Sequence, residues 1–258
     1  MKRNLLIGSL LLGLGLSAAQ AGDKVLKIGI EAAYPPFAFT QSDGSLAGFD
    51  YDIGNALCKQ MQVQCKWVEQ EYDGLIPSLK VRKVDAVLSS LSITDDRRKS
   101  VDFTHPYYRS AARLALKAGT VVADDLSGLE GKRIGVQRSS VHDRFATDVL
   151  KAKGVEVVRY TSQNEVYLDL QSGRLDGTLA DDVILDQTFL KKPAGQGFAF
   201  VGPKLTDPKY FGDGIGIAVR KGDGALAEQF NQALAAIRAD GSYQAINARY
   251  FDFDVYGE

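Results

Sequence analysis

Hydroxyl and guanidinium groups gather between residues 85 and 98 in a pattern that suits an anion-binding site. Residues 86–88 are apolar and predict a short buried strand. Three hydroxyl side chains follow where that strand ends: Ser89, Ser90 and Ser92. Thr94 is a good helix N-cap, but Arg97 is poorly placed against the positive end of the helix dipole. Free backbone N–H groups, the hydroxyls and this guanidinium could hold a carboxylate or a phosphate; a solvated surface arginine is the alternative.

Residues 1–21 have the pattern of a secretory signal peptide. Lys2 and Arg3 form a basic start, residues 5–16 form an apolar core, and Ala19-Gln20-Ala21 is a small-residue cleavage site. The apolar run is too short to span a bilayer. We therefore expect an exported, soluble mature protein, with the peptide removed after Ala21.

Charge and cysteine content narrow the function classes. Removal of Lys2 and Arg3 from the 31 basic residues leaves 29 against 32 acidic residues, which excludes a strongly basic nucleic-acid binder.

Cys58 and Cys65 lie close together in an exported chain and predict a disulfide, worth roughly 2–2.5 kcal/mol for so short a loop. No histidine stands at ligand spacing from them, so we expect neither a reactive thiol nor a metal pair at these cysteines.

Alternating strand and helix patterns predict two α/β units, the second beginning near residue 112. In the first unit, strands at 25–30, 65–68 and 86–88 alternate with helices begun by Asp50 and Asp73. In the second unit, strands are expected at 113–117, 133–136, 155–158 and 177–180. Its helices begin at Ser139 or Ser140, at Asn164 and at Asp181. A strand at 215–220 and helices at 225–239 and 242–250 could belong to either unit.

Four stretches follow strands of these two units. Because ligands in open α/β sheets bind beyond the carboxyl ends of the strands, these stretches are candidate ligand contacts: 31–34, 89–92, 137–141 and 180–181. The two units could therefore close face to face on a small molecule.

Six motifs spread over the whole mature chain carry a family resemblance: 33–37 (AYPPF), 48–54 (GFDYDIG), 75–79 (LIPSL), 88–94 (LSSLSIT), 173–177 (GRLDG) and 210–214 (YFGDG). The chain resembles periplasmic solute-binding proteins of polar amino-acid ABC transporters, in the lysine/arginine/ornithine and histidine branch. Arginine/ornithine-binding proteins are the most similar. The Cys58–Cys65 pair is similar to a disulfide of this branch.

The resemblance implies a two-lobed periplasmic binding protein fold of type II. Each lobe would be a sheet flanked by helices, and a two-strand hinge would join them. Lobe I would be residues 22–110 and 206–258, and lobe II residues 111–205. The partners would be a cationic amino acid and a membrane ABC permease complex, and the protein would be a monomer without cofactor.

The resemblance also implies a role for each candidate side chain. Arg97 matches the clamp for the ligand α-carboxylate, helped by the backbone N–H of Ser92. The acceptors for the α-ammonium are Ser90, Ser92 and Asp181. Tyr34 and Tyr72 match two aromatic residues that sandwich the ligand side chain. Glu31 matches the acid that meets a distal cation, with Ser89 near it. A flat guanidinium would stack on rings and pair with a carboxylate, which favours arginine over lysine.

Three residues depart from the family pattern. Val141 replaces a threonine, His142 a frequent glutamine, and Gln137 a common leucine. We expect all three to lie in the pocket, so the order of preference among arginine, ornithine, lysine, histidine and arginine-derived opines cannot be copied from the family.

Plainer interpretations and other functions remain open for the same residues. Tyr34 and Tyr72 could be packing residues, Glu31 a solvated loop carboxylate and Asp181 a helix cap. Some chains of this fold are secreted cyclohexadienyl dehydratases, and Glu31 or His142 could then act as the general acid. A sensor domain reporting to a separate partner is a third interpretation. No nucleophile–base pair or metal set is visible in the sequence, so we expect a binding protein and not an enzyme.

Overall fold

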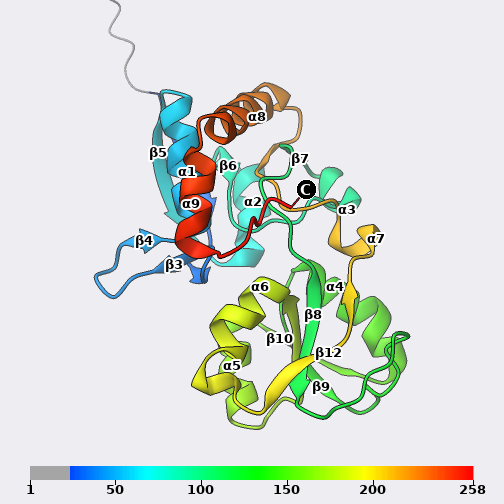
Figure 1. Ribbon diagram of the computed structural model, residues 1–258. Coiled ribbons are helices and arrows are strands. Elements are labelled where there is room, and N and C mark those ends of the chain that lie inside the picture. Colours follow the sequence, from blue (N-terminus) through cyan, green and yellow to red (C-terminus); the bar gives the residue numbers. More distant parts are fainter. Residues whose placement is uncertain (1–23, 258) are drawn as a thin grey trace, which may run out of the picture.

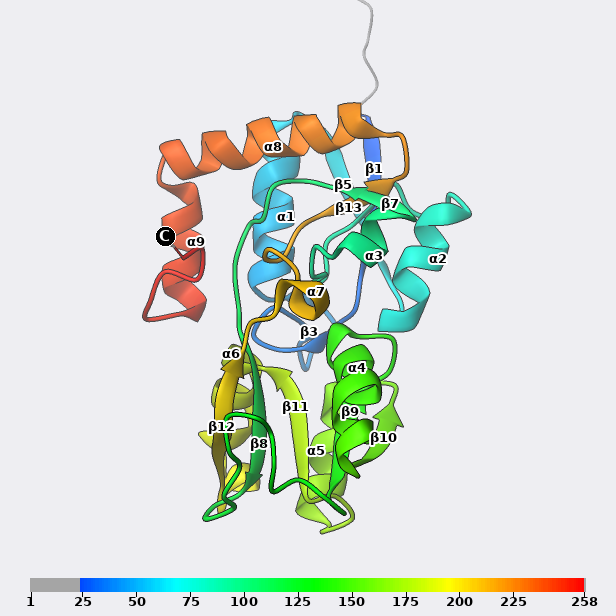
Figure 2. The same cartoon turned by 90° about the vertical axis from the view of Figure 1, so that its right-hand side faces the viewer.

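The computed structural model describes residues 24–257, which form two lobes, each built on a five-stranded sheet (Figures 1 and 2). Two segments cross between the lobes. One joins β7 (Val101–Phe103) to β8 (Ala112–Lys117), and the other joins β12 (Phe198–Leu205) to β13 (Ala218–Arg220). The predicted two-lobed α/β class is confirmed, whereas the predicted signal peptide at residues 1–21 lies outside the described residues.

The first sheet has the strand order β5-β1-β6-β13-β7. Strand β1 (Val25–Ile30) pairs in parallel with β5 (Gln64–Glu69) and with β6 (Ala86–Val87). Strand β13 runs antiparallel to both β6 and β7. The strand near residue 218, which the sequence pattern left unassigned, therefore lies in the first sheet.

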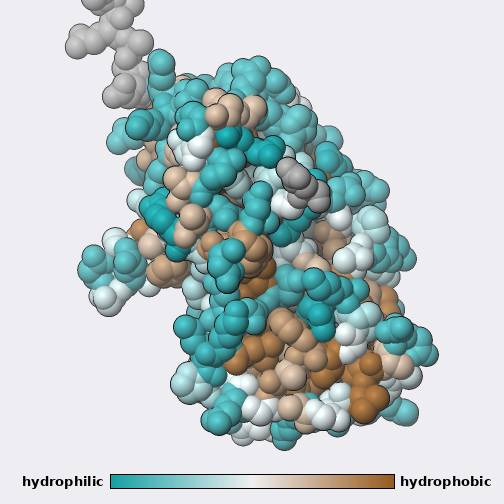
Figure 3. Space-filling model, in the orientation of Figure 1, coloured by the Kyte–Doolittle hydropathy of each residue, from teal (hydrophilic) through white to brown (hydrophobic). Residues whose placement is uncertain are grey.

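The second sheet has the strand order β10-β9-β11-β8-β12. Strand β9 (Arg133–Gln137) pairs in parallel with β10 (Glu156–Tyr160) and with β11 (Gly177–Asp181), and β8 runs antiparallel to β11 and β12. On the face shown in Figure 3, apolar residues gather over this lobe, in the region of β8 and β12, and the first lobe is mostly hydrophilic.

Helices cover both sheets (Figure 1). The first lobe carries α1 (Phe49–Gln60), the 3₁₀ turn η1 (Tyr72–Gly74), α2 (Leu75–Lys80), α3 (Asp95–Arg98), α8 (Gly224–Ala239) and α9 (Ser242–Tyr250). The second carries α4 (Val141–Phe145), η2 (Ala146–Leu150), η3 (Lys151–Lys153), α5 (Gln163–Gln171), α6 (Asp182–Ile184), η4 (Leu185–Leu190) and η5 (Pro193–Gly195). The short helix α7 (Pro208–Phe211) lies on the second crossing. A small sheet of β2 (Ala33–Tyr34), β3 (Ala38–Thr40) and β4 (Leu46–Ala47) borders the first lobe.

Several predicted helix starts agree with the structure and others are wrong. Thr94 caps α3 by accepting from the Arg97 N–H at 3.3 Å, and Ser140 caps α4. The predicted caps Asp50 and Asp73 are wrong, because each lies inside its helical segment. The helix expected to start at Asn164 is capped by Ser162 through a capping box.

Asp50 does not cap α1, because Gly48 occupies the N-cap position, and the Asp50 side chain is buried. Gly48 is the N-cap residue with φ +120°, and a Cβ there would lie 2.3 Å from the Phe37 carbonyl oxygen. The buried Asp50 carboxylate accepts from the Ser90 N–H at 2.8 Å, the Ser90 hydroxyl at 3.0 Å and the Tyr107 hydroxyl at 2.8 Å. It thereby holds Ser90, which has a φ of +49°, at the end of β6.

The predicted disulfide between Cys58 and Cys65 is confirmed, with 5.9 Å between the Cα atoms. It joins α1 to the edge strand β5, so the helix that carries Asp50 is tied covalently to the first sheet.

The Asp50 network predicts a large stability effect from a single substitution. Asp50→Ala leaves three buried donors without their acceptor and should lower the free energy of unfolding by about 3 kcal/mol, measured by urea denaturation. The exposed Asp124→Ala serves as control and should change it by less than about 0.5 kcal/mol. A loss below about 1 kcal/mol in Asp50→Ala would contradict this account of the network.

Candidate ligand-binding site

The carboxyl ends of strands from both sheets meet between the lobes. Glu31 follows β1, Ser89 and Ser90 follow β6, and Gln137 and Asp181 end β9 and β11. Nine residues enclose a space of about 10 Å³, roughly the size of one water molecule: Tyr34, Tyr72, Ser90, Ser92, Gln137, Ser140, Val141, His142 and Asp181. In this arrangement the polar groups of the two lobes bond directly to one another.

Glu31 contacts Gln137, which lines this space, and is 5% exposed. Its Oε1 accepts from the Gln137 Nε2 of the other lobe at 2.6 Å, and its backbone N–H donates to the Ser89 hydroxyl at 2.9 Å. Burial raises the pKa of the Glu31 carboxyl to about 7; the bond from Gln137 opposes this shift, and the Asp73 and Glu71 carboxylates add to it. This carboxyl therefore changes charge near neutral pH.

Asp181 faces the cleft from the second lobe. It occupies the N-cap position of α6, but its side chain accepts no backbone N–H there. Instead, its Oδ2 accepts from the Tyr34 hydroxyl at 2.6 Å. His142 Nε2 lies 3.5 Å from the Asp181 Oδ1 and is buried without a hydrogen-bond partner. Asp181 thus occupies the predicted cap position, but its carboxylate bonds across to the first lobe instead of to the helix N-terminus.

Arg97 projects from α3 toward the second lobe. Its guanidinium donates to the Ser92 carbonyl at 3.0 Å, to the Tyr72 hydroxyl at 3.0 Å and to the Ser139 carbonyl across the cleft at 3.5 Å. It also lies 5.8 Å from the centre of the Tyr72 ring. All its recorded partners are neutral, so an anion would be a stronger partner for this cation.

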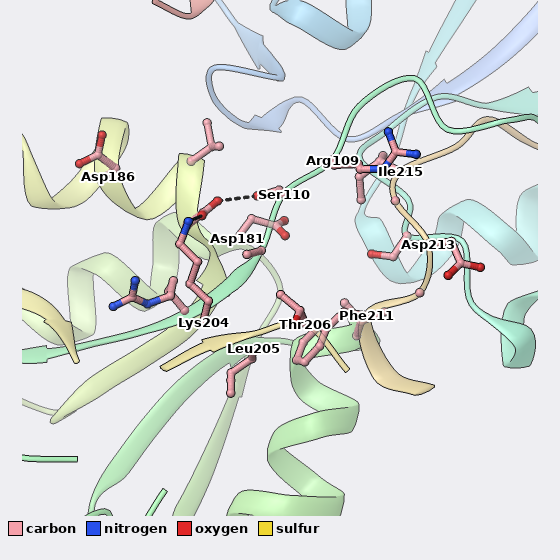
Figure 4. Close-up of a pocket in the computed structure, with 18 of the residues that line it drawn as sticks. Arg109, Ser110, Asp181, Asp186, Lys204, Leu205, Thr206, Phe211, Asp213 and Ile215 are labelled. Atoms are coloured by element: carbon pink, nitrogen blue, oxygen red, sulfur yellow. Dashed lines mark hydrogen bonds and ion pairs between the residues drawn. The ribbon is translucent and has the colours of Figure 1, made fainter. Parts of the chain in front are cut away.

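A larger cavity of about 820 Å³ adjoins this site beside the crossing segments (Figure 4). It reaches Asp181, Ser92 and Val141 from the hinge side. Within it, the Ser110 hydroxyl donates to the Asp182 carboxylate at 2.9 Å, and Lys204 lies 3.8 Å from the same carboxylate.

Comparison with known proteins identifies the family. Residues 26–253 match the model of bacterial extracellular solute-binding proteins, family 3. The chain belongs to this family. It is 58% identical to an L-arginine-binding protein of Pseudomonas aeruginosa, over 100% of this chain and 99% of the relative. It is 45% identical to the lysine/arginine/ornithine-binding periplasmic protein of Escherichia coli K12, with 100% of both chains covered.

The fold of this family-3 protein also has solved counterparts. A Salmonella typhimurium periplasmic binding protein, described as having high arginine specificity, superposes with a TM-score of 0.80 at 33% identity. The match covers 88% of this chain and 99% of that one. Among residues 24–257, no helix combines the length and apolar character needed to cross a bilayer.

The eleven side chains that the sequence singled out lie together in this solute-binding protein. Eight line the small space. Glu31 and Arg97 contact lining residues, and Ser89 contacts Glu31. Whether each contacts a ligand stays a prediction. Sequence reasoning missed the lining role of Ser140, which was considered as a helix cap alone, and the support that Asp50 gives to Ser90.

Ion pairs on the rim of the cleft also join the lobes. Arg138 Nη2 lies 2.6 Å from the Glu71 Oε2, and its Nε lies 2.7 Å from the Asp73 Oδ2. Arg144 lies 3.5 Å from Asp96. These side chains are partly exposed, so each pair contributes at most about 1 kcal/mol, but the pairs form only while the lobes are together.

The Arg138 contacts predict a shift in lobe separation. Arg138→Ala should raise the fraction of widely separated lobes about threefold in ligand-stripped protein, because two bridging contacts are lost. Spin labels at the exposed Val81 and Leu168, one in each lobe, would report the distance by pulsed electron resonance.

Arg174→Ala is the matched control, because Arg174 pairs with Asp169 within the second lobe. An unchanged distance distribution in Arg138→Ala, or the same change in both variants, would contradict a bridging role.

Proposed function

We propose that this protein is a periplasmic receptor that binds a cationic L-amino acid, arginine and also ornithine, and delivers it to the membrane permease of an ABC transporter. The observation that carries the proposal is a buried carboxylate and a guanidinium held by neutral partners, each bonded to residues that line an enclosed space. A cationic amino acid has the complementary charges, an α-carboxylate and a distal cation.

Each group of the ligand has an assigned partner in this proposal. Arg97 and the Ser92 N–H take the α-carboxylate, and Asp181 with the hydroxyls of Ser90 and Ser92 takes the α-ammonium. The aliphatic stem lies between Tyr34 and Tyr72, and Glu31 takes the distal cation with Ser89 beside it. The present contacts support this assignment, because both carboxylates already accept hydrogen bonds in the cleft. The Asp181 carboxylate accepts from the Tyr34 hydroxyl, and the Glu31 carboxylate accepts from the Gln137 amide.

Binding then acts through closure of the lobes. We assign residues 22–110 with 206–258 to lobe I and residues 111–205 to lobe II, so that the ligand bridges Arg97 and Asp181. A ligand that contacts both lobes shifts the population toward the closed form, which the permease would read. The name of the Escherichia coli relative supports a periplasmic location. We also propose that the signal peptide is removed after Ala21 and that the mature protein acts as a monomer.

An enzyme of the cyclohexadienyl dehydratase type is the second candidate, and one observation favours it. A carboxyl with a pKa of about 7 in a closed cleft, as at Glu31, is suited to general acid catalysis. Optical assay of a cyclic dienyl acid substrate separates the two proposals, since the receptor gives no turnover.

Two substitutions at opposite ends of the site test the receptor. Arg97→Ala should weaken binding of every amino acid more than 100-fold, because the α-carboxylate loses its cation. Glu31→Ala should weaken arginine binding more than tenfold and reduce the preference for arginine over glutamine. Calorimetry gives both affinities, and Glu228→Ala on the distant α8 is the control. Unchanged arginine affinity in Glu31→Ala would refute the pocket assignment.

The raised pKa of Glu31 predicts a pH-dependent affinity. A cationic ligand binds the ionised carboxylate, so below pH 7 it must displace a proton from Glu31. Arginine affinity should be highest above pH about 7.5 and fall by up to tenfold per pH unit below 7.

Calorimetry between pH 5.5 and 8 in wild type and Glu31→Gln isolates this effect, because pH dependence from any other group is shared by both. The slope should disappear in Glu31→Gln. The same slope in both proteins would show that Glu31 is not the titrating group.

A further inference from the structure

Gln137 is a buried glutamine whose amide is held at the nitrogen from two sides. It ends β9, is 5% exposed and lines the space between the lobes. Its Nε2 donates to the Glu31 Oε1 of the other lobe at 2.6 Å and to the Thr161 carbonyl of its own lobe at 3.1 Å. A side-chain amide nitrogen carries two hydrogens, so both are used.

These two partners fix which way the amide points. Both are acceptors, so rotating the amide by 180° would place the Gln137 carbonyl oxygen against a carboxylate and a carbonyl. The Oε1 of Gln137 is therefore the atom left to accept, and among the described residues no hydrogen bond to it is recorded. Glu31 similarly uses Oε1 for Gln137 and keeps Oε2.

We propose that Gln137 is a specificity-determining residue that makes the distal end of the pocket select a guanidinium over a primary ammonium. The inference rests on the receptor function proposed above. The hydrogen bond that joins the two side chains leaves the Oε1 of Gln137 and the Oε2 of Glu31 as acceptors. Such a pair of acceptors suits donors carried on different nitrogens of one planar group.

A guanidinium meets this demand better than an ammonium does. It carries five N–H donors in a rigid plane, so one edge serves the Glu31 carboxylate while another N–H reaches the Gln137 carbonyl. The ornithine ammonium has its three donors on a single nitrogen and would leave a buried acceptor without a partner. An unsatisfied buried acceptor costs enough to change an affinity about tenfold.

The decisive experiment compares arginine and ornithine affinities by calorimetry in wild type, Gln137→Leu and Gln137→Glu. Leucine removes the acceptor, so arginine loses a hydrogen bond and ornithine no longer leaves an acceptor unpaired. The ratio of arginine affinity to ornithine affinity should therefore fall about tenfold. Glutamate keeps an acceptor at this position, so the preference for arginine over ornithine should remain at least as high as in wild type. Gln171→Leu, exposed in the same lobe, is the control and should leave both affinities unchanged.

The outcomes separate this inference from the proposed function. Equal losses for both ligands in Gln137→Leu would mean that Gln137 merely supports Glu31, and equal gains would mean that it competes for Glu31; either result overturns the inference alone. If Gln137→Leu does not fold, loss of the arginine preference in Gln137→Glu overturns it. Failure of wild type to bind either ligand overturns the proposed function as well.

Discussion

Two buried carboxylates, one from each lobe, set the geometry of the cleft. Burying a carboxylate is costly unless it is hydrogen-bonded or paired. Glu31 of the first lobe accepts from Gln137 of the second, and Asp181 of the second accepts from Tyr34 of the first. Each lobe therefore supplies the partner that the acid of the other lobe needs, and the two halves of the site are complete only when the lobes meet.

This reciprocity explains how a small molecule could control whether the two lobes stay together. The contacts that hold the lobes together are a few hydrogen bonds at the strand ends and exposed ion pairs around Arg138. Each such contact contributes little net free energy, because the same groups bond to water when the lobes separate. A ligand that supplies several charge-assisted bonds to both lobes at once can outweigh them and shift the population.

Strands, helices and helix caps were predictable where residues close in the sequence determine them. Alternating apolar strands and helices gave the α/β class, and Thr94 and Ser140 cap the helices they were expected to cap. Asp50 and Asp73 look like caps but are not, because distant partners compete for their carboxylates: Ser90 and Tyr107 for one, Arg138 for the other. Ligands in open α/β sheets bind beyond the carboxyl ends of the strands, and this rule was enough to predict that the residues following the strands lie together. The hydrogen bond between Glu31 and Gln137 was not predictable, because the two residues are 106 positions apart and no local pattern signals their contact.

Thermal unfolding of the mature, ligand-stripped protein against a panel of amino acids tests the central claim most directly. A ligand at about 100 times its dissociation constant stabilises the folded state by about 2.7 kcal/mol, which raises the melting temperature by several degrees. We predict such a rise with arginine and ornithine and little change with glutamine or glutamate. No rise with any amino acid would contradict the receptor account.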